Sequence, residues 1–189
     1  MLKRFFDITV SLAFICTLFP LSYILIGMAI RLTSRGPVLF RQKRTGKDGR
    51  VFTLLKFRTM IVNDRSDILQ ATRDDNRLTS VGNFLRRTSL DELPQFINVL
   101  RGDMSIVGPR PHMLYHTEIY STLIPCYMRR LSVRPGITGV AQVLGYRGET
   151  PAVTDMARRV RLDLWYIGHR SFGLDIRILV RTFLDFIKL

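Results

Sequence analysis

Acidic residues and cysteines are scarce in this 189-residue chain. Only 15 Asp and Glu face 29 Lys and Arg, which leaves a formal net charge of +14. This surplus favours an anionic partner, which could be nucleic acid, acidic lipid headgroups or a phosphorylated substrate. The two cysteines, Cys16 and Cys126, argue against a disulfide framework because Cys16 lies inside an apolar run. No Cys and His spacing is typical of a zinc site. The length suffices for one domain with its own core.

Charge is also absent from residues 8–30, although the chain is basic on both sides of this run. A membrane-spanning helix needs about 20 apolar residues, so the run is long enough to enter a bilayer. Lys3 and Arg4 precede it and Arg31 follows it, and cytoplasmic flanks collect such residues. Pro20 lies near the middle, where it removes one helical hydrogen bond. The run therefore predicts either a re-entrant helix that breaks at Pro20 and returns to the same face, or a kinked spanning helix.

Two strands are predicted directly after this segment. Residues 37–42 and 51–60 flank a turn-rich stretch over residues 43–50, a pattern typical of a β-hairpin. Side chains alternate along a strand, so Lys56 and Arg58 are expected on one face of the hairpin. That face could equally be a solvated basic surface.

The rest of the chain is predicted to be mainly helical. Residues 61–77 are polar and indicate a mobile loop. The Gly-rich residues 134–149 indicate an ordered loop, and residues 174–189 form an amphipathic pattern that suits either a membrane interface or a core-facing helix. Helices are expected at residues 79–87 with Val81, Phe84 and Leu85 on the apolar side, from about residue 93 to Gly102, at 113–130, at 151–166 and at 174–189.

Two adjacent acids, Asp91 and Glu92, stand in the stretch SLDELPQFINVLRG at residues 89–102. One interpretation is structural, since Ser89 and Glu92 match a capping box at the start of a helix. Pro94 argues against it, because proline prefers the first helical position. If the helix begins at Pro94, the two acids lie just outside its N-terminus. There we expect them to be exposed, in a local field that lowers the pKa of an acid.

Several arginines lie near this pair in the sequence. Arg86 and Arg87 precede it, and Arg110 is held between two prolines. Arginine forms bidentate pairs with phosphate oxygens. Carboxylates beside a phosphate need either a bridging divalent cation or a role in attack on phosphorus. The pattern therefore suggests phosphoryl transfer, with one acid as nucleophile and the other handling a proton.

Several long motifs in order give the chain a resemblance to the bacterial sugar transferase family, the monotopic phosphoglycosyl transferases. They are KFRTM at 56–60, DNRLTSVGNFLRR at 75–87, SLDELPQFINVLRGDMSIVGPRP at 89–111 and RPGITG at 134–139. The resemblance implies transfer of a sugar 1-phosphate from a UDP-sugar to undecaprenyl phosphate, with release of UMP and a requirement for Mg²⁺. This is the first membrane step of exopolysaccharide, capsule or O-antigen synthesis.

The resemblance also assigns roles to particular residues. Asp91 would attack the β-phosphate and hold the metal, and Glu92 would assist by deprotonating the lipid phosphate. Arg86 and Arg110 would bind phosphate, with Lys56 and Arg58 as further candidates. The expected fold is a mainly helical α+β domain with a small β-hairpin and interfacial amphipathic helices. Residues 1–35 would form a re-entrant membrane helix broken at Pro20, and residues 36–189 a catalytic domain on the cytoplasmic face of the bacterial inner membrane.

Some positions depart from the family pattern. Phe19 replaces a serine found in some members, and Val140 replaces a tryptophan found in many. Residues 116–120 and 146–150 look more like the branch that uses UDP-glucose or UDP-galactose. The sequence leaves the sugar and the oligomeric state open, a homodimer included, and a short enzyme or the catalytic part of a longer chain would both fit. The rival hypotheses are a non-catalytic membrane adaptor of a polysaccharide assembly complex and a nucleic-acid-binding protein, for which no known motif is present.

Overall fold

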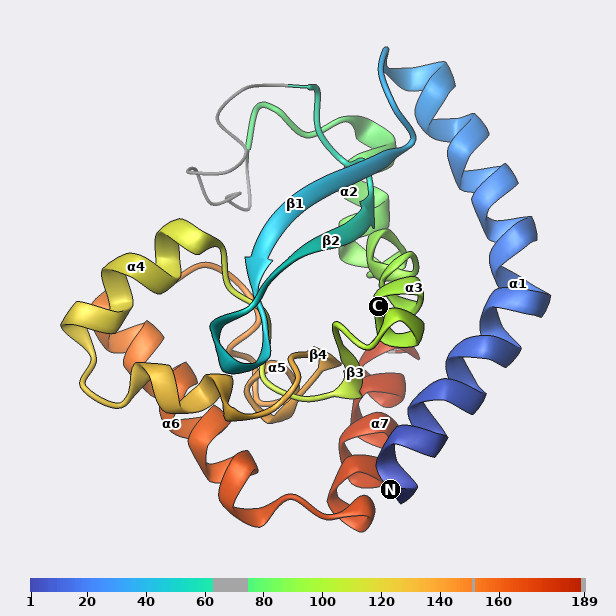
Figure 1. Ribbon diagram of the computed structural model, residues 1–189. Helices are drawn as coiled ribbons and strands as arrows, with labels where there is room; N and C mark the ends of the chain where they lie inside the picture. Colours follow the sequence, from blue (N-terminus) through green and yellow to red (C-terminus); the bar gives the residue numbers. More distant parts are fainter. Residues whose placement is uncertain (63–74, 151, 188–189) are drawn as a thin grey trace.

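The computed structural model describes residues 1–62, 75–150 and 152–187, and within them the chain is mainly helical (Figure 1). Two small sheets, each of two strands, lie among the helices. The helices are α1 Leu2–Thr33, α2 Ser80–Arg87, α3 Gln95–Arg101, α4 Leu114–Leu123, α5 Val140–Val143, α6 Val153–His169 and α7 Phe172–Ile187. Three short 3₁₀ turns are η1 Lys47–Gly49, η2 Leu90–Glu92 and η3 Tyr127–Ser132. The strands are β1 Leu39–Thr45, β2 Val51–Phe57, β3 Ser105–Val107 and β4 Gly136–Thr138.

Helix α1 is the one helix in the described residues that is long and apolar enough to cross a membrane. It runs along one side of the molecule, and Figure 1 shows it changing direction near its middle. Pro20 lies inside this helix, which continues as one element on both sides of it. The predicted break at Pro20 is therefore not confirmed, since the chain bends without interrupting the helix. Large apolar side chains on α1, such as Leu18, Leu21 and Ile24, are more than half exposed, which is consistent with association with a membrane.

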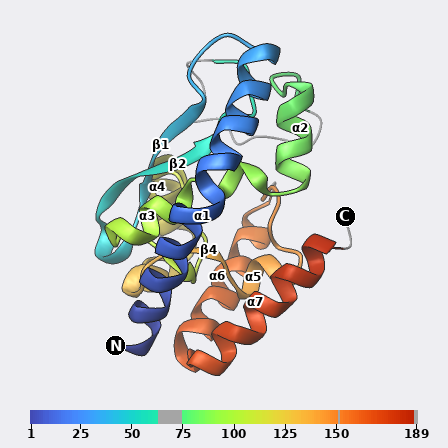
Figure 2. The same cartoon turned by 90° about the vertical axis from the view of Figure 1, so that its right-hand side faces the viewer.

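Polar contacts fix the first turns of α1 to the rest of the fold. The buried Asp7 carboxylate accepts hydrogen bonds from Ser105 Oγ at 2.8 Å and from the Ile106 N–H at 3.0 Å. Lys3 Nζ pairs with Asp175 Oδ2 at 2.7 Å, so this end of α1 also holds α7. Both views show α7 beside the N-terminal half of α1 (Figure 2). The helix is thus attached through side chains that are polar and specific, although most of its surface is apolar.

The predicted hairpin is confirmed, with β1 and β2 pairing antiparallel from Leu39 opposite Phe57 to Thr45 opposite Val51. Its second strand docks on α3 through the buried Asn98. The Asn98 amide oxygen accepts from the Leu55 N–H at 3.0 Å, and its nitrogen donates to the Thr53 carbonyl at 2.8 Å. Asn98 therefore takes the place of a neighbouring strand and fixes β2 relative to the helix that follows the acidic pair.

Most of the predicted helices are present, with corrections to their ends and faces. Thr79 caps α2 through its side chain, and Gly102 ends α3 with a φ of 89°. Phe84, expected on the apolar side of α2, is 59% exposed. The helix predicted over residues 113–130 ends earlier, and η3 follows it. Of the loop predicted over residues 61–77, residues 63–74 lie outside the described part of the chain.

The Gly-rich segment contains more regular structure than the sequence predicted. Strand β4 pairs in parallel with β3, and α5 follows it directly. The two strands carry three residues each, too few for a periodic pattern to reveal them. Around this pair the main core gathers side chains from β2, α3, α6 and α7, including Leu54, Val99, Tyr166 and Ile178.

Helix α7 fits both of the interpretations that its sequence allowed. Ile178 is buried in the core, whereas Val180 and Phe183 are more than half exposed. The helix therefore packs on the domain and also presents an apolar outer side. Whether that side lies in a membrane interface stays a prediction.

We expect Asp7→Ala to destabilise the fold, because it leaves the buried Ser105 hydroxyl and Ile106 N–H without an acceptor. Unsatisfied groups of this kind cost about 2 kcal/mol, which should lower the unfolding temperature by roughly 4–8 °C. Thermal unfolding of the detergent-solubilised chain, followed by tryptophan fluorescence, measures the change. Glu118→Ala, at an exposed position on α4, is the matched control. Equal unfolding temperatures for the two variants would contradict the anchoring role of Asp7.

Candidate active site

The acidic pair lies in η2, the turn between α2 and α3. Ser89 precedes it with a φ of 57°, a left-handed conformation that ends α2 and redirects the chain. The Ser89 side chain does not cap the following turn, so the capping-box interpretation is wrong. Instead its hydroxyl accepts a hydrogen bond from Arg147 Nη2 at 2.6 Å. Pro94 stands immediately before α3, which places both acids outside that helix, as its position in the sequence suggested.

Both acids are buried rather than exposed, which corrects the prediction from the sequence. Asp91 is 5% exposed and Glu92 is 6% exposed. The sequence did not reveal this burial because the groups that compensate the two charges come from distant segments. Buried carboxylates persist only where cations or hydrogen-bond donors face them.

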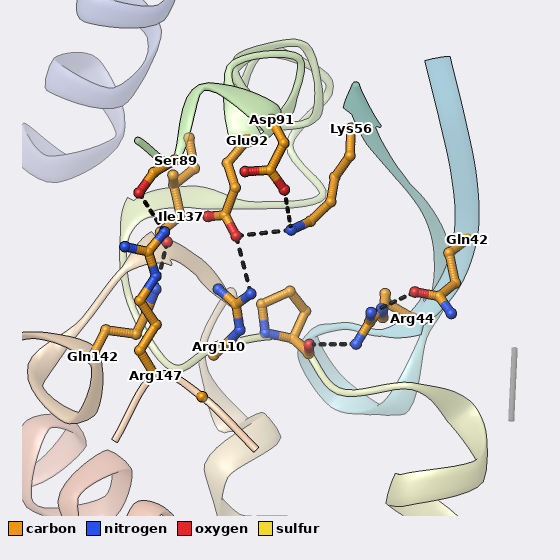
Figure 3. A network of polar contacts seen from close by, with 12 residues as sticks. Gln42, Arg44, Lys56, Ser89, Asp91, Glu92, Arg110, Ile137, Gln142 and Arg147 are labelled. Carbon is orange, nitrogen blue, oxygen red and sulfur yellow. Dashed lines mark hydrogen bonds and ion pairs between the residues drawn. The ribbon is translucent and has the colours of Figure 1, made fainter. Parts of the chain in front are cut away.

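Lys56, on β2, is the cation shared by the two acids. Its Nζ lies 3.2 Å from Asp91 Oδ2 and 2.8 Å from Glu92 Oε1 (Figure 3). Arg110 Nη2 approaches the same Glu92 oxygen at 3.0 Å. The network therefore joins two of the predicted site residues, Lys56 and Arg110, to the acidic pair. Glu92 contacts two cations, whereas Asp91 contacts one.

The electrostatic balance at Glu92 favours its ionised form. Burial by itself would raise the pKa of Glu92, but the charges of Arg110, Lys56 and Arg147 outweigh it and hold this pKa well below its usual range. In return, the Glu92 carboxylate raises the pKa of Arg110. A carboxyl with a lowered pKa is a weak base, so Glu92 in this arrangement is better suited to hold Lys56 and Arg110 than to accept a proton.

The backbone that carries Arg110 is held by close packing and by a buried ion pair. Gly108 lies against Gly136 so tightly that a Cβ on Gly136 would come within 2.1 Å of the Gly108 nitrogen. The buried Arg130 donates to the Arg110 carbonyl at 2.6 Å while its guanidinium pairs with Asp163 at 2.8 Å. These contacts, together with the two prolines beside it, fix the starting point of the Arg110 side chain.

The pair faces a cavity of about 1100 Å³, of which Asp91 forms part of the wall. Several basic side chains from distant segments line the same cavity: Lys56, Arg86, Arg87, Arg110 and Arg147. The cavity also reaches Tyr23 and Arg31 on α1, so it extends from the acidic pair to the apolar helix. Its size suits a sugar nucleotide, and its charge suits a ligand that carries phosphate.

Two of the predicted phosphate-binding residues lie apart from the ion network. Arg86 lines the cavity from the last turn of α2, where its charge also suits the helix dipole. Arg58 is buried and donates to the main-chain carbonyls of Ser34, Arg35 and Gly36. Those hydrogen bonds hold the residues after α1 against the segment after β2. They also occupy Nη1 and Nη2 of Arg58, the atoms that would otherwise bind phosphate.

Sequence reasoning missed the basic residues on the far side of this cavity. Arg147 and Arg159 come from segments far along the chain from the acidic pair, and only the fold brings them to the wall of the same cavity. Arg147 stands in YRGET at residues 146–150, a segment whose composition gave no sign of a contact with Ser89. The one available signal was the overall surplus of basic residues.

Comparison with known proteins adds independent information about the chain. A family model described as "Bacterial sugar transferase" matches residues 1–189. The chain is 51% identical over 183 residues to an Escherichia coli K12 protein named UDP-glucose:undecaprenyl-phosphate glucose-1-phosphate transferase, which covers 96% of this chain and 39% of that protein. It is 49% identical to a Caulobacter vibrioides protein of the same name, covering 95% of this chain and 67% of that protein.

A shorter relative matches over most of its length. The "Exopolysaccharide production protein PSS" of Rhizobium leguminosarum is 43% identical over 186 residues, which cover 96% of this chain and 92% of that protein. The chain thus spans about two fifths of the Escherichia coli relative and nearly all of the Rhizobium one.

The lowered pKa of Glu92 predicts a specific pH dependence of stability. A carboxyl whose pKa is lower in the folded than in the unfolded state stabilises the fold above the unfolded pKa, and this contribution is lost as the pH falls through the folded pKa. We therefore expect Glu92→Gln to be less stable than the wild type at pH 7, with a gap that shrinks once the pH falls below about 4.5, the ordinary value for Glu. Urea denaturation of both proteins at pH 7, 5, 4 and 3 measures this gap. A gap that stays constant across this range would contradict the electrostatic explanation.

Proposed function

Because this chain belongs to the bacterial sugar transferase family, we propose that it moves a sugar 1-phosphate from a UDP-sugar to undecaprenyl phosphate and releases UMP. The observation that carries the proposal is the pair of buried carboxylates, neutralised by Lys56 and Arg110, beside a basic cavity that reaches an apolar helix. Such a site suits a soluble anionic donor and an acceptor that stays in a lipid bilayer. Glucose is the first sugar to test, since it is named in two relatives that are about half identical to this chain, and galactose is the second.

The first step assigns the role of nucleophile to Asp91. A carboxylate oxygen of Asp91 attacks the β-phosphorus of the UDP-sugar, and a new P–O bond forms. The bond from that phosphorus to the bridging oxygen breaks, and the electron pair leaves on UMP. Asp91 suits this role better than Glu92 because it lines the cavity and makes a single contact with Lys56, whereas Glu92 is held by two cations.

The second step returns the enzyme to its starting state. An oxygen of the lipid phosphate attacks the phosphorus of the acyl phosphate, and the P–O bond to Asp91 breaks, which restores the carboxylate. In both steps Lys56, Arg110 and Arg86 would bind phosphate oxygens, since all three line the cavity. Glu92 would keep Lys56 and Arg110 in place, and its predicted action on the proton of the lipid phosphate is left to experiment.

The carboxylates also fit a bound Mg²⁺. Magnesium in proteins is held by one or two carboxylates together with substrate phosphates. Asp91 is the residue that would hold it, because Asp91 lines the cavity and its Oδ2 alone contacts Lys56. A bound Mg²⁺ would neutralise charge on the donor's phosphates.

The proposed location is the inner membrane, with the catalytic residues on the cytoplasmic face. Undecaprenyl phosphate remains in the bilayer, since each buried CH₂ group contributes about 0.8 kcal/mol. A re-entrant α1 would keep both ends of the helix on the face where UDP-sugars are found. The bend in α1, with basic residues on both flanks, supports this topology (Figure 1). The reaction would be the first membrane step of exopolysaccharide or related glycoconjugate synthesis.

We expect the chain in detergent, with Mg²⁺ and undecaprenyl phosphate, to release UMP from one UDP-hexose of a panel. Asp91→Asn should lower this rate by at least about 10³-fold, because the amide cannot form the acyl phosphate. Asp48→Asn, which changes an exposed carboxylate, should behave as the wild type. Chelation of Mg²⁺ should abolish release. Release that persists in Asp91→Asn would exclude Asp91 as nucleophile, and no release from any donor would favour the non-catalytic adaptor.

The re-entrant topology predicts that Leu2 and Ser34 lie on the same side of the membrane. Each can be replaced by cysteine after Cys16 and Cys126 are changed to serine. We expect an impermeant maleimide to label neither position in intact spheroplasts and both in inverted vesicles. Asp48→Cys, on the hairpin turn, reports the cytoplasmic face. Labelling of residue 2 in intact spheroplasts would show that α1 spans the membrane.

A further inference from the structure

Arg159, on α6, is a buried cation that the reaction described above does not use. It is 4% exposed, and it forms part of the wall of the same cavity as Asp91 and Arg110. Its neighbour on the helix, Arg158, is exposed. Arginine is almost never buried without a partner for its charge, so the environment of Arg159 needs an explanation.

Within the described residues, no carboxylate lies within ion-pair distance of Arg159. Its Nη2 donates to the Gly148 carbonyl at 2.7 Å, and its Nε is buried with no hydrogen-bond partner. The acid that attracts it, Asp163, is already bound by Arg130 through two hydrogen bonds of 2.9 Å and 2.8 Å. Burial, together with the neighbouring charge of Arg110, lowers the pKa of Arg159 to about 10. The Arg159 guanidinium therefore carries a charge that the attraction of Asp163 balances only in part, without an ion pair in the described residues.

His112 supplies a second donor on the wall of this cavity. It is 3% exposed, and burial holds its pKa well below the usual range, so the imidazole is neutral. Its Nδ1 lies 2.6 Å from the Tyr127 hydroxyl, whose own pKa is raised by burial. A phenol with a raised pKa keeps its hydrogen, and donating that hydrogen to His112 makes Nδ1 the acceptor. The remaining hydrogen then sits on His112 Nε2, a buried atom without a partner in the described residues.

We propose that Arg159 binds the phosphate of the departing UMP, with His112 Nε2–H as a second donor to the same nucleotide. The inference rests on the proposed function, because it assumes that UMP is the leaving group. When the bond between the β-phosphorus and the bridging oxygen breaks, the electron pair moves to the α-phosphate, which gains negative charge. Lys56 and Arg110 are engaged with the acids, whereas the buried Arg159 can meet this new charge without releasing a carboxylate.

The arrangement separates the two phosphates of the donor between two sets of cations. Lys56 and Arg110 lie on the acid side, where the β-phosphate would react, and Arg159 lies close enough to Arg110 for their charges to interact. The phosphates of a nucleoside diphosphate are adjacent, so neighbouring cations match them. The competing explanation is structural, since Arg159 also holds the Gly148 carbonyl. The two explanations differ in which step of the reaction they affect.

The experiment measures the two half-reactions separately in Arg159→Gln, with Arg158→Gln as the matched control on the same helix. Without lipid acceptor, a burst of UMP equal to the enzyme reports the first step. Addition of undecaprenyl phosphate to the preformed adduct, after removal of UMP, reports the second. We expect Arg159→Gln to slow the burst by about 10- to 100-fold, the loss expected for a charged hydrogen bond, and to weaken inhibition by added UMP. The second step should keep the wild-type rate, because UMP has left by then.

Each other outcome of this experiment is decisive. Equal slowing of both steps, with a lower unfolding temperature, would assign Arg159 a structural role and overturn the inference. A burst in Arg159→Gln that matches the wild type and Arg158→Gln would overturn it as well. Absence of any UMP burst in the wild type would instead overturn the proposed function, on which the inference rests. Arg159→Lys, which keeps the charge, should recover part of the burst rate.

Discussion

The burial of two adjacent carboxylates is the constraint on which the rest of the structure depends. Asp91 and Glu92 are almost inaccessible, and such charges are tolerated only where cations meet them. Lys56 from the hairpin and Arg110 from the segment after β3 must therefore both lie within ion-pair distance of the acids. Asn98 fixes β2 on α3, and the contact of Gly108 with Gly136 fixes the backbone that leads to Arg110. Both contacts therefore help to place the cations that neutralise the two buried acids.

In the described part of the fold, some of the basic side chains are paired with acids or carbonyl groups, and others are not. Arg130, Arg110 and Lys56 neutralise buried acids, and Arg58 binds main-chain carbonyls. Other arginines line the cavity with fewer acids to balance them, so its interior is positive. A bound anionic ligand would then balance the positive charge of the cavity. The same cavity extends to α1, so in the proposed reaction one site would be within reach of both a soluble anion and a lipid.

Local patterns in the sequence predicted the elements with strong local signals. The hairpin, α2 with its Thr79 cap and α3 with its Gly102 end are all present. Two of the residues predicted for the site, Lys56 and Arg110, do contact the acidic pair. Their roles stay predictions, and they came from the family resemblance as well as from spacing. The burial of the pair and the role of Arg159 depend on contacts between segments far apart in the chain. The short β3 and β4 could not be found because strands of three residues have no period to detect.

Helix α1 is tied to the domain at both of its ends. Lys3 and Asp7 hold its beginning to α7 and β3, while Arg58 holds the carbonyls that follow its last turn. Arg58 stands two residues after Lys56, so the attachment at the end of α1 lies close in the chain to the cation of the acidic pair. Because α1 is attached at both ends, the position of Asp91 relative to this helix is fixed. The depth of α1 in the lipid would therefore also set the level of Asp91 relative to the membrane. In the proposed reaction the acceptor would then be selected by geometry, since only a phosphate presented at that level could reach the carboxylate.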